Sequence, residues 1–466
     1  MLHLPNGAAL AEACGGTLLF DGGKAVTSAV SDSRHAREGA LFVAIAGERT
    51  DGHRYLVSAA ELGAAAVLVE QKEIPLEELK ALGCSVVLCE NTIRALGRLG
   101  QYHKALCPAL TVAVTGSVGK TTTRQFLYAV LSQHFLTHKT EGNYNSDIGL
   151  PLTLFDLTPE HQASVLELGM SAKGEISYLT NLVHPDIAVI TNIGTAHIEF
   201  LGSREAIRDA KMEIAEGLAP DGRLLLNGDE PLLADVAGAI YVALYNETAA
   251  YRAVNLRYTP EGMRFDAVCP GSVIENCLIA TLGEHTVLDA MFAVAAGHLT
   301  GLTSEEIRRG LAAFEGVGMR QNIRQENGIT YVLDYYNASP ESIRASLTVT
   351  KRLAENQGGR TVAVLGSVLE LGEQSETLHR GIGAFAAGLP VDLLFTFGAD
   401  AAYAAEEAVA CGMSPEAVLP FPDVSDAAPL TEAVRKALRP GDAVLLKASH
   451  SIRLERVADE LIQPNN

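Results

Sequence analysis

The stretch 112-VAVTGSVGKTTT-123 joins a short apolar run to a glycine-rich segment that ends in Lys120 and three threonines. In the common phosphate-binding loop, G-x-x-x-x-G-K-[ST], a glycine would stand at the position of Val114. The available glycine is Gly116, so the motif is the shorter T-G-x-x-G-K-T-T. The apolar run predicts a strand, the glycines permit a tight turn, and a helix is expected from about Lys120.

A helix that starts directly after such a turn presents backbone N–H groups and its positive end to an anion. Lys120 can bridge the β- and γ-phosphates of a nucleotide, and the hydroxyl of Thr121 can hold Mg²⁺. The alternative is an ordinary glycine-rich turn with a solvated lysine, which the complete motif disfavours. The predicted phosphate site consists of consecutive residues, namely Thr115, Gly116, Ser117, Val118, Gly119, Lys120, Thr121 and Thr122.

The composition is typical of a globular protein with several packed cores and an acidic surface. The chain has 466 residues, of which 48% are hydrophobic and 20% charged, and its formal net charge is −20. At about 150 residues per domain, this length predicts roughly three domains. Nucleic acids and anionic membranes attract clustered Lys and Arg, so the charge argues against both as partners.

Cysteine usage and the N-terminal segment indicate the compartment. The seven cysteines are scattered and form no C-x-x-C pair, which argues against a disulfide framework and against a zinc site. The start, MLHLPNGAAL, lacks a basic segment followed by an apolar core, and no apolar run approaches the ~18 residues of a membrane span. A soluble cytosolic protein is therefore expected.

Short apolar runs alternate with helical stretches in three blocks, which predicts three consecutive α/β domains, 1–105, 106–316 and 317–466. The central domain is expected to be like a P-loop ATPase, with a mostly parallel sheet, and the last to be doubly wound and Rossmann-like. The strand candidates are 41–47, 64–70, 110–115, 163–169, 186–192, 223–227, 329–336, 361–366, 391–398 and 443–449.

Two polar residues follow central strands at their carboxyl ends, where α/β sheets bind ligands. The carboxylate of Glu167 suits a Mg²⁺ ion facing a nucleotide, and an exposed glutamate at a strand end is the alternative. His197, in 191-TNIGTAHIEFLG-202, is by itself most simply a structural or exposed histidine. Asn143 and Asn145 precede an apolar run and are explained equally well as turn residues or as ligand contacts.

Lys211 is unusual because it lies on an apolar stripe of a predicted helix. At helical spacing its neighbours are Ile207, Ile214 and Ala215, whereas most surface lysines have polar neighbours. A buried amine must find a carboxylate partner, lose its charge or be chemically altered. A lysine whose stem lies along apolar surface and whose ammonium reaches water is the alternative.

Together these segments resemble the Mur ligase family, ATP-dependent enzymes that add amino acids to the peptidoglycan precursor. The phrases LELGEQSE and YNASP are typical of the members that use UDP-N-acetylmuramoyl-tripeptide and D-alanyl-D-alanine. The resemblance covers nearly the whole chain and is carried by 32-DSRHAREGALFVAIAGERTDGH-53, the T-G-S-x-G-K-T-T loop, 142-GNYNSDIGLPLTL-154, 187-IAVITNIGTAHIEFLGS-203, 334-DYYNASPES-342, 363-AVLGSVLELGEQSETLH-379 and 444-VLLKASHSIRLE-455.

The resemblance implies that ATP and Mg²⁺ activate the tripeptide carboxylate as an acyl phosphate, which the amine of D-alanyl-D-alanine attacks. It also implies a monomer that acts in peptidoglycan synthesis. The implied catalytic residues are Lys120, His197 and Lys211, and the implied Mg²⁺ ligands are Thr121, Glu167, His197 and a carbamylated Lys211. The implied ATP contacts beyond the loop are Asp289, Arg320 and Asp334. The implied substrate contacts are Ser31, Asp32, Ser33, Arg34, Asn143, Asn145, Tyr336 and Asn337.

The chain departs from the family pattern in three motifs. Thr286 and Asp289 replace the two asparagines of H-N-x-x-N-A, near the nucleotide base, and a carboxylate cannot donate a hydrogen bond as an amide does. Ser367 replaces the acid of L-G-D-M. The motif D-D-S-Y-N-A-N-P is altered at Leu333, Tyr335 and Ser339.

Two other functions are compatible with these motifs. One is another carboxylate–amine ligase, such as a folylpolyglutamate-synthase-like enzyme, although segment 32–53 favours a UDP-sugar over a folate. The other is a catalytically weakened nucleotide-binding homologue, which the changes at Thr286, Asp289 and Ser367 favour. The complete set of phosphate-binding and metal-binding residues argues against that second alternative.

Overall fold

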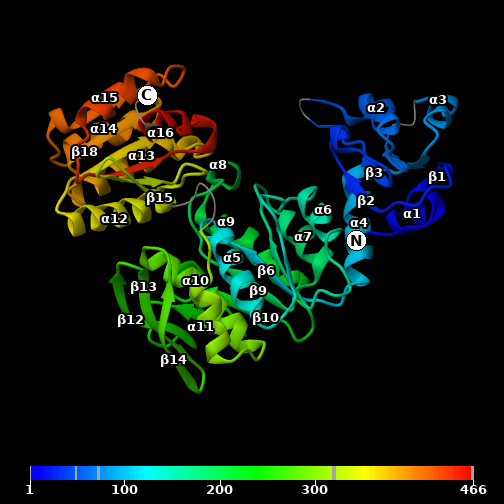
Figure 1. Ribbon diagram of the computed structural model, residues 1–466, viewed down its shortest axis with the longest axis horizontal. Coiled ribbons are helices and arrows are strands. Elements are labelled where there is room, and N and C mark those ends of the chain that lie inside the picture. Colours follow the sequence, from blue (N-terminus) through cyan, green and yellow to red (C-terminus); the bar gives the residue numbers. More distant parts are fainter. Residues whose placement is uncertain (1, 48–49, 71–73, 317–321, 463–466) are drawn as a thin grey trace. The chain divides into compact units, whose positions relative to one another are not determined.

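The computed structural model describes residues 2–47, 50–70, 74–316 and 322–462. This part of the chain forms three β-sheets with helices packed on them, which confirms the predicted α/β class (Figure 1). The chain packs as two compact units, which are described separately. The first comprises Met1–Thr115, Leu131–Val189 and Ala210–Leu225, and the second comprises Gly116–Val130, Ile190–Asp209 and Leu226–Asn466.

The N-terminal sheet, in the first unit, has the strand order β1-β5-β4-β3-β2. Its strands are β1 (Thr17–Phe20), β2 (Ser28–Val30), β3 (Ala40–Val43), β4 (Ala66–Val69) and β5 (Ser85–Leu88). Only β1 among them runs antiparallel to its neighbour. Helices α1 (Gly7–Cys14) and α4 (Thr92–Ala105) pack on one face, and α2 (Leu56–Glu61) and α3 (Leu76–Ala81) on the other. Burial of both faces explains why the inner strands are apolar throughout.

The central sheet has nine strands in the order β14-β13-β12-β11-β10-β9-β6-β8-β7. The predicted strands appear as β6 (Leu110–Thr115), β8 (Ala163–Glu167), β9 (Ile187–Ile190) and β10 (Arg223–Asn227), joined by β7 (Thr137–Lys139) and β11 (Ile240–Ala243). The helices that accompany them are α5 (Lys120–Leu131), α6 (Gly149–Leu154), α7 (Glu175–Val183), α8 (Ile198–Leu201), α9 (Arg204–Met212), α10 (Glu284–Leu299) and α11 (Ser304–Ala312).

An antiparallel extension of this sheet was not predicted from the sequence. It consists of β12 (Tyr251–Thr259), β13 (Gly262–Cys269) and β14 (Ser272–Ile279). The signal was present, because β13 alternates buried and partly exposed residues and a two-residue turn precedes and follows it. The sheet is therefore parallel where the phosphate loop starts and antiparallel at the far edge.

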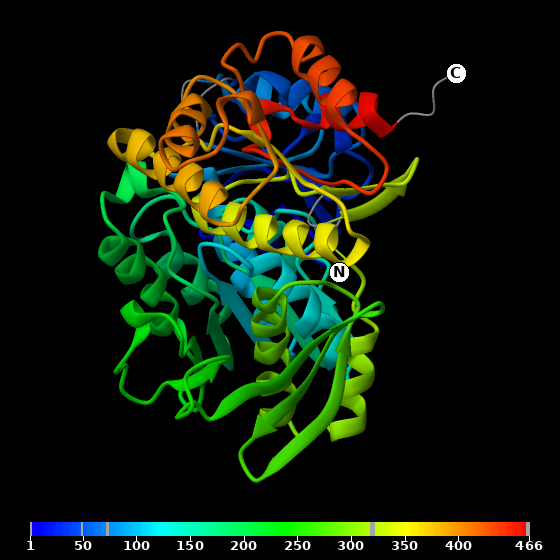
Figure 2. The same ribbon diagram turned by 90° about the vertical axis from the view of Figure 1, so that its left-hand side faces the viewer.

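The third sheet, in the second unit, has the strand order β15-β16-β20-β17-β18-β19 and is parallel apart from its edge strand β15. Its strands are β15 (Asn322–Glu326), β16 (Ile329–Leu333), β17 (Thr361–Gly366), β18 (Leu393–Phe397), β19 (Val418–Phe421) and β20 (Ala443–Lys447). Helices α15 (Ala428–Ala437) and α16 (Glu455–Ile462) cover one face. The other face carries α12 (Pro340–Gln357), α13 (Ser375–Gly388) and α14 (Ala401–Ala410), as Figures 1 and 2 show. This is the doubly wound arrangement predicted.

None of the helices in the described ranges combines the length and the apolar character that a membrane crossing requires. The predicted domain limits, 1–105, 106–316 and 317–466, stay a prediction.

Candidate active site

The phosphate loop requires glycine at both positions of its short motif. β6 ends at Thr115 and α5 begins at Lys120, so only four residues make the turn. Gly116 and Gly119 have φ angles of 151° and 88°, which favour glycine. A Cβ atom on Gly116 would lie 1.9 Å from Oγ1 of Thr191, and one on Gly119 would lie 2.5 Å from Oδ1 of Asp289. Neither position therefore has room for a side chain, since Thr191 and Asp289 lie directly against the turn.

The neighbouring strand end holds this loop in place. The backbone N–H of Val118 donates to Oδ1 of Asn192 at 2.9 Å, and Oγ1 of Thr191 donates to the carbonyl of Val118 at 2.5 Å. The ammonium of Lys120 donates to the carbonyl of Gly116 at 2.8 Å. The loop is thus ordered by contacts within the second unit, and its lysine lies over the turn.

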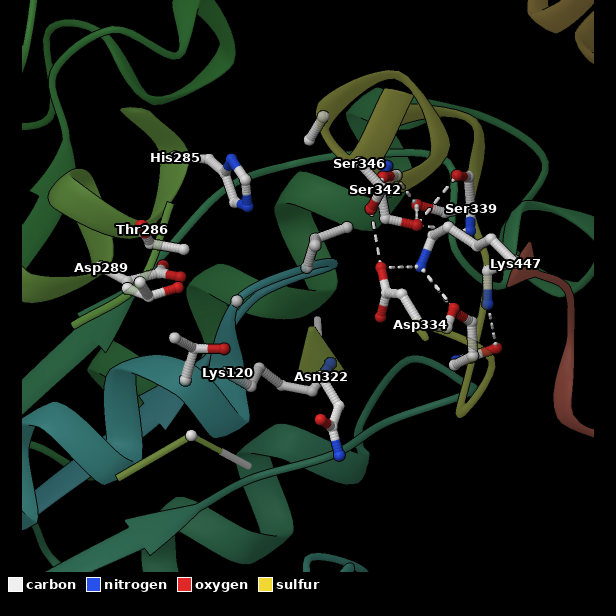
Figure 3. Close-up of a pocket in the computed structure, with 18 of the residues that line it drawn as sticks. Lys120, His285, Thr286, Asp289, Asn322, Asp334, Ser339, Ser342, Ser346 and Lys447 are labelled. Atoms are coloured by element: carbon white, nitrogen blue, oxygen red, sulfur yellow. Dashed lines mark hydrogen bonds and ion pairs between the residues drawn. The ribbon is translucent and has the colours of Figure 1, made fainter. Parts of the chain in front are cut away.

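The loop lines a pocket of about 570 Å³, within the usual size of a small-molecule site (Figure 3). The pocket is formed by the loop, by the start of α10, by β15, by the segment from β16 into α12 and by the end of β20. The sequence-predicted residues that line it are Ser117, Val118, Gly119, Lys120, Thr122, Asp289, Asp334 and Asn337. Thr115, Gly116, Thr121 and Tyr336 do not line it, and Arg320 lies outside the described residues.

One wall of the pocket contains Thr286 and Asp289, two of the residues that depart from the family pattern. Figure 3 shows Thr286 and Asp289 on the same side as Lys120. Oγ1 of Thr123, on α5, donates to Oδ1 of Asp289 at 3.0 Å, and both side chains are buried. The hydroxyl of Thr286 donates to the carbonyl of Gly283 at 2.7 Å, within the first turn of α10. Asp289 therefore connects α10 to the helix of the phosphate loop.

We expect Thr123→Val to lower the free energy of unfolding by about 1.5–3 kcal/mol, because it removes a hydrogen bond to a buried carboxylate. Chemical denaturation measures this change. The control is Thr348→Val, whose hydroxyl is exposed and bonds only within its own helix. Equal stability of both variants would contradict a stabilising role for the bond to Asp289.

The opposite wall is built around a buried ion pair that the sequence prediction missed. Nζ of Lys447 lies 2.6 Å from Oδ2 of Asp334 and donates to the carbonyl of Asn337 at 3.0 Å. Oγ of Ser346 donates to the same Asp334 oxygen at 2.7 Å. The sequence signal was a lysine at the end of an apolar strand, 444-VLLK-447. A buried charge without its partner costs free energy, so this ion pair should stay formed. Lys447 therefore fixes the position of the Asp334 carboxylate at the pocket.

His285 is a further titratable group of the pocket, on the same helix as Thr286 and Asp289. It lines the pocket at the start of α10, and desolvation lowers its pKa to about 4. The imidazole is therefore neutral at physiological pH and has one nitrogen able to accept a hydrogen bond. Asn322 and Ser342 also line the pocket and were not predicted from the sequence.

In the first unit, Glu167 and Lys211 are both buried, with side chains only 2% exposed. The alternatives of an exposed glutamate and of a lysine that reaches water are therefore wrong. Oε1 of Glu167 accepts a hydrogen bond of 2.8 Å from Nδ2 of Asn145, so Asn145 orients this carboxylate. Asn143 is exposed in the same loop.

His197 and Glu370 meet in an unusual backbone setting in the second unit. Nδ1 of His197 lies 2.6 Å from Oε2 of Glu370, away from the direction of an ideal hydrogen bond, so the contact is electrostatic. The φ angles are 64° for His197 and 62° for Glu370, a region that non-glycine residues rarely adopt. The backbone N–H of Glu199 donates to the carbonyl of Glu370 at 3.2 Å. Strained residues that are held by several contacts often occur at functional sites.

The remaining predicted residues lie elsewhere. In the N-terminal domain, Asp32 caps the short 3-10 helix Ser33–His35, and hydrogen bonds from Arg34 lower the pKa of Asp32 to about 2. Ser31 precedes that turn. The ring of Tyr336 lies 5.7 Å from that of His450. Among the residues that the structure describes, no three His, Cys, Asp or Glu side chains form a metal-binding group.

Family models match three segments of the chain. Residues 26–103 match the "Mur ligase family, catalytic domain", residues 114–297 the "Mur ligase middle domain", and residues 319–450 the "Mur ligase, glutamate ligase domain". Structures of two folylpolyglutamate synthase complexes from Mycobacterium tuberculosis are 20% and 18% identical, with TM-scores of 0.60 and 0.62, and share the fold.

Relatives with higher identity extend over nearly the full length. The UDP-N-acetylmuramoyl-tripeptide–D-alanyl-D-alanine ligase of Bacillus subtilis is 38% identical over 93% of this chain and 92% of its own. Crystal structure I of MurF from Acinetobacter baumannii is 30% identical, covers 98% of both chains and has a TM-score of 0.88. MurF from Thermotoga maritima, in complex with ADP, is 28% identical with a TM-score of 0.81 and covers 94% of this chain and 97% of its own. The sequence motifs, the phosphate loop and these matches show that the chain belongs to the Mur ligase family.

Proposed function

We propose that this chain joins D-alanyl-D-alanine to the terminal carboxylate of UDP-N-acetylmuramoyl-tripeptide with the consumption of ATP, for peptidoglycan synthesis. The observation that carries the proposal is the full-length similarity to ligases of that name, at 38% identity in one case. The intact phosphate loop at a pocket of about 570 Å³ supports ATP as the energy source, as does the ADP complex of the Thermotoga maritima relative.

The chemistry proposed for the site has two steps. A carboxylate is a poor electrophile, so the γ-phosphate of ATP is first transferred to the tripeptide carboxylate, which gives an acyl phosphate and ADP. The dipeptide amine then attacks the acyl carbon, and inorganic phosphate leaves as the amide forms. Lys120 neutralises charge on the transferring group, while the backbone N–H groups of the loop hold the phosphates. Asp289 and Asp334 are the proposed contacts on the nucleoside side.

The proposed Mg²⁺ ligands are Thr121, Glu167, His197 and Lys211. Glu167 fits this assignment, because its carboxylate is only 2% exposed, is oriented by Asn145, and offers the oxygen ligands that Mg²⁺ prefers. Lys211 fits it in carbamylated form, because reaction with CO₂ converts a buried amine into an oxygen ligand. Mg²⁺ bound there would stabilise the negative charge on the phosphates.

The proposed contacts to the peptidoglycan precursor lie in two regions. Ser31, Asp32, Ser33 and Arg34 would contact the UDP-sugar end, and Asn143 and Asn145 the remainder of that substrate. Tyr336 and Asn337 are further proposed substrate contacts, and Arg320 is the proposed cation that reaches ATP.

We expect Glu370→Gln to weaken Mg²⁺ binding, because the carboxylate that faces Nδ1 of His197 orients the ring and raises its basicity as a ligand. The apparent Mg²⁺ affinity should fall about 10–100-fold. It is measured both by Mg²⁺-dependent thermal stabilisation and by the Mg²⁺ requirement of turnover. Glu373→Gln, an exposed acid in the next turn, is the control. Identical Mg²⁺ dependence in the two variants would refute this role.

The function is tested by phosphate release from Mg²⁺-ATP with UDP-N-acetylmuramoyl-tripeptide, with and without D-alanyl-D-alanine. Release that requires both substrates, with the UDP-pentapeptide detected by mass, supports the proposal. Release with another amine would indicate a ligase with a changed amino substrate. No release with any pairing, while ATP still binds, would indicate the weakened homologue.

A further inference from the structure

A second, smaller pocket of about 300 Å³ lies beside the nucleotide pocket, within the second unit. Its lining comes from the loop after β9, the starts of α9 and α12, the loop after β10, and α13. The two pockets share walls, because Ala196 and Ser339 line the larger one while the adjacent Thr195 and Pro340 line the smaller one.

Gly194 forms the thinnest part of the wall between the small pocket and the phosphate loop. A Cβ atom at Gly194 would lie 3.0 Å from Oε2 of Glu341, which lines the small pocket, and 3.2 Å from Cβ of Ser117 in the loop. A ligand in the small pocket is therefore about one residue away from the loop that holds the transferred phosphate.

The carboxylate of Glu341 is fixed at this pocket. Its Oε1 accepts hydrogen bonds from the backbone N–H and the hydroxyl of Thr195, at 3.0 and 3.1 Å, and its Oε2 lies 3.2 Å from the same hydroxyl. Each carboxylate oxygen has more than one acceptor site, so Oε2 retains the capacity to bind an ammonium group. The pocket thus presents an oriented negative charge on its side nearest the phosphate loop.

The positive charge of the pocket comes from two arginines, which differ in the hydrogen bonds and ion pairs that their guanidinium groups make. Arg204 is satisfied, because it donates to the carbonyl of Ile193 at 2.6 Å and pairs with Glu230 at 3.0 Å. Arg344 makes no ion pair or side-chain hydrogen bond with any described residue, and its buried Nε atom has no hydrogen-bond partner there. Its guanidinium carbon Cζ lies over the Phe385 ring, 5.9 Å from the ring centroid.

An unpaired guanidinium in such a position indicates an anionic ligand. The chain has 56 acidic residues against 36 basic ones, so a carboxylate partner for Arg344 was readily available from the protein itself. A partly buried donor without a partner costs free energy, and such groups usually have a role when they persist.

We propose that the small pocket binds the amino substrate, a short zwitterionic peptide, with Glu341 at its ammonium and Arg344 at its carboxylate. This inference rests on the proposed function and specifies where its second substrate lies. An extended dipeptide spans about 7 Å, which suits a pocket of about 300 Å³, whereas a UDP-sugar peptide is too large for it. Ile193, Pro340 and Leu378 give the pocket apolar surface for small side chains.

The test compares Arg344→Gln with Lys351→Gln, a control on the same helix whose ammonium donates to the carbonyl of Pro390 at 3.3 Å and does not line the small pocket. Steady-state kinetics should show the KM for D-alanyl-D-alanine raised about 10–100-fold in Arg344→Gln, with the KM values for ATP and UDP-tripeptide unchanged. D-alanyl-D-alaninamide, which lacks the carboxylate, should be a poor substrate of the chain without substitutions. Its KM should rise little further in Arg344→Gln. A thermal unfolding curve for each variant establishes that it is folded. If Arg344→Gln does not fold, Arg344→Lys replaces it as the test variant.

An unchanged KM for the dipeptide, or a raised KM for the UDP-tripeptide instead, would overturn the assignment. The assignment would also be overturned if Arg344→Gln raised the KM for the dipeptide and for its amide by the same factor. Failure of the proposed function is distinguishable, because the unmodified chain would then make no UDP-pentapeptide. If a different amine is the true substrate, the same kinetics with that amine and its carboxamide decide the role of Arg344.

Discussion

Lys120→Ala should lower kcat for ADP formation by at least about 10²–10³-fold, the effect of removing a donor that stabilises charge in a transition state. The ammonium lies over the turn of the phosphate loop, 2.8 Å from the carbonyl of Gly116, and lines the nucleotide pocket. The backbone of the loop is also held by Thr191 and Asn192, whose hydrogen bonds do not involve the lysine. The variant should therefore keep its fold and much of its affinity for the nucleoside.

The measurements are the rate of ADP formation with saturating substrates, ADP binding by calorimetry and the thermal unfolding temperature. Lys173→Ala, at an exposed position, is the matched control and should leave all three unchanged. A Lys120→Ala variant with near-normal turnover would show that charge on the transferring phosphate is neutralised elsewhere, and the assigned role of the loop would be wrong.

The local sequence was sufficient to predict those parts of the fold in which short-range pattern and tertiary environment agree. β6 was predicted with its observed limits because 110-LTVAVT-115 is apolar, β-branched and followed by glycine. The four inner strands of the third sheet, β16, β17, β18 and β20, were found for the same reason, since a parallel sheet buries both faces. Its edge strands β15 and β19, which are less buried, were not predicted. The extension β12–β14 was missed because its strands are half exposed and alternate, a weaker signal than a continuous apolar run.

The site was only partly predictable, because its walls are built from residues far apart in the chain. The loop motif identified Lys120 and its neighbours, but nothing local to Lys447 says that its partner is Asp334, 113 positions away. Arg344 likewise looks like an ordinary helical arginine in the sequence, and only the folded chain shows that no described carboxylate pairs with it. Burial and pairing are properties of the tertiary structure, so they become visible only there.

The second large effect is expected at Lys211. Lys211→Met should lower the Mg²⁺-dependent rate about 10²–10³-fold, because methionine cannot be carbamylated and cannot contribute an oxygen ligand. The position is 2% exposed, and methionine has a volume similar to that of lysine, so the substitution should leave no large cavity there. Turnover and thermal unfolding are measured on the same preparations.

Dependence on CO₂ separates carbamylation from a purely structural role of Lys211. The protein with its natural Lys211, after dialysis in CO₂-free buffer, should lose activity and regain it on addition of bicarbonate. Lys211→Met should respond to neither treatment, and Lys173→Met, at an exposed position, should behave like the unmodified chain. If the protein with its natural Lys211 kept full activity after CO₂ removal while Lys211→Met lost activity, the ammonium without a carbamyl group would be the active form. The buried amine would then act through its positive charge.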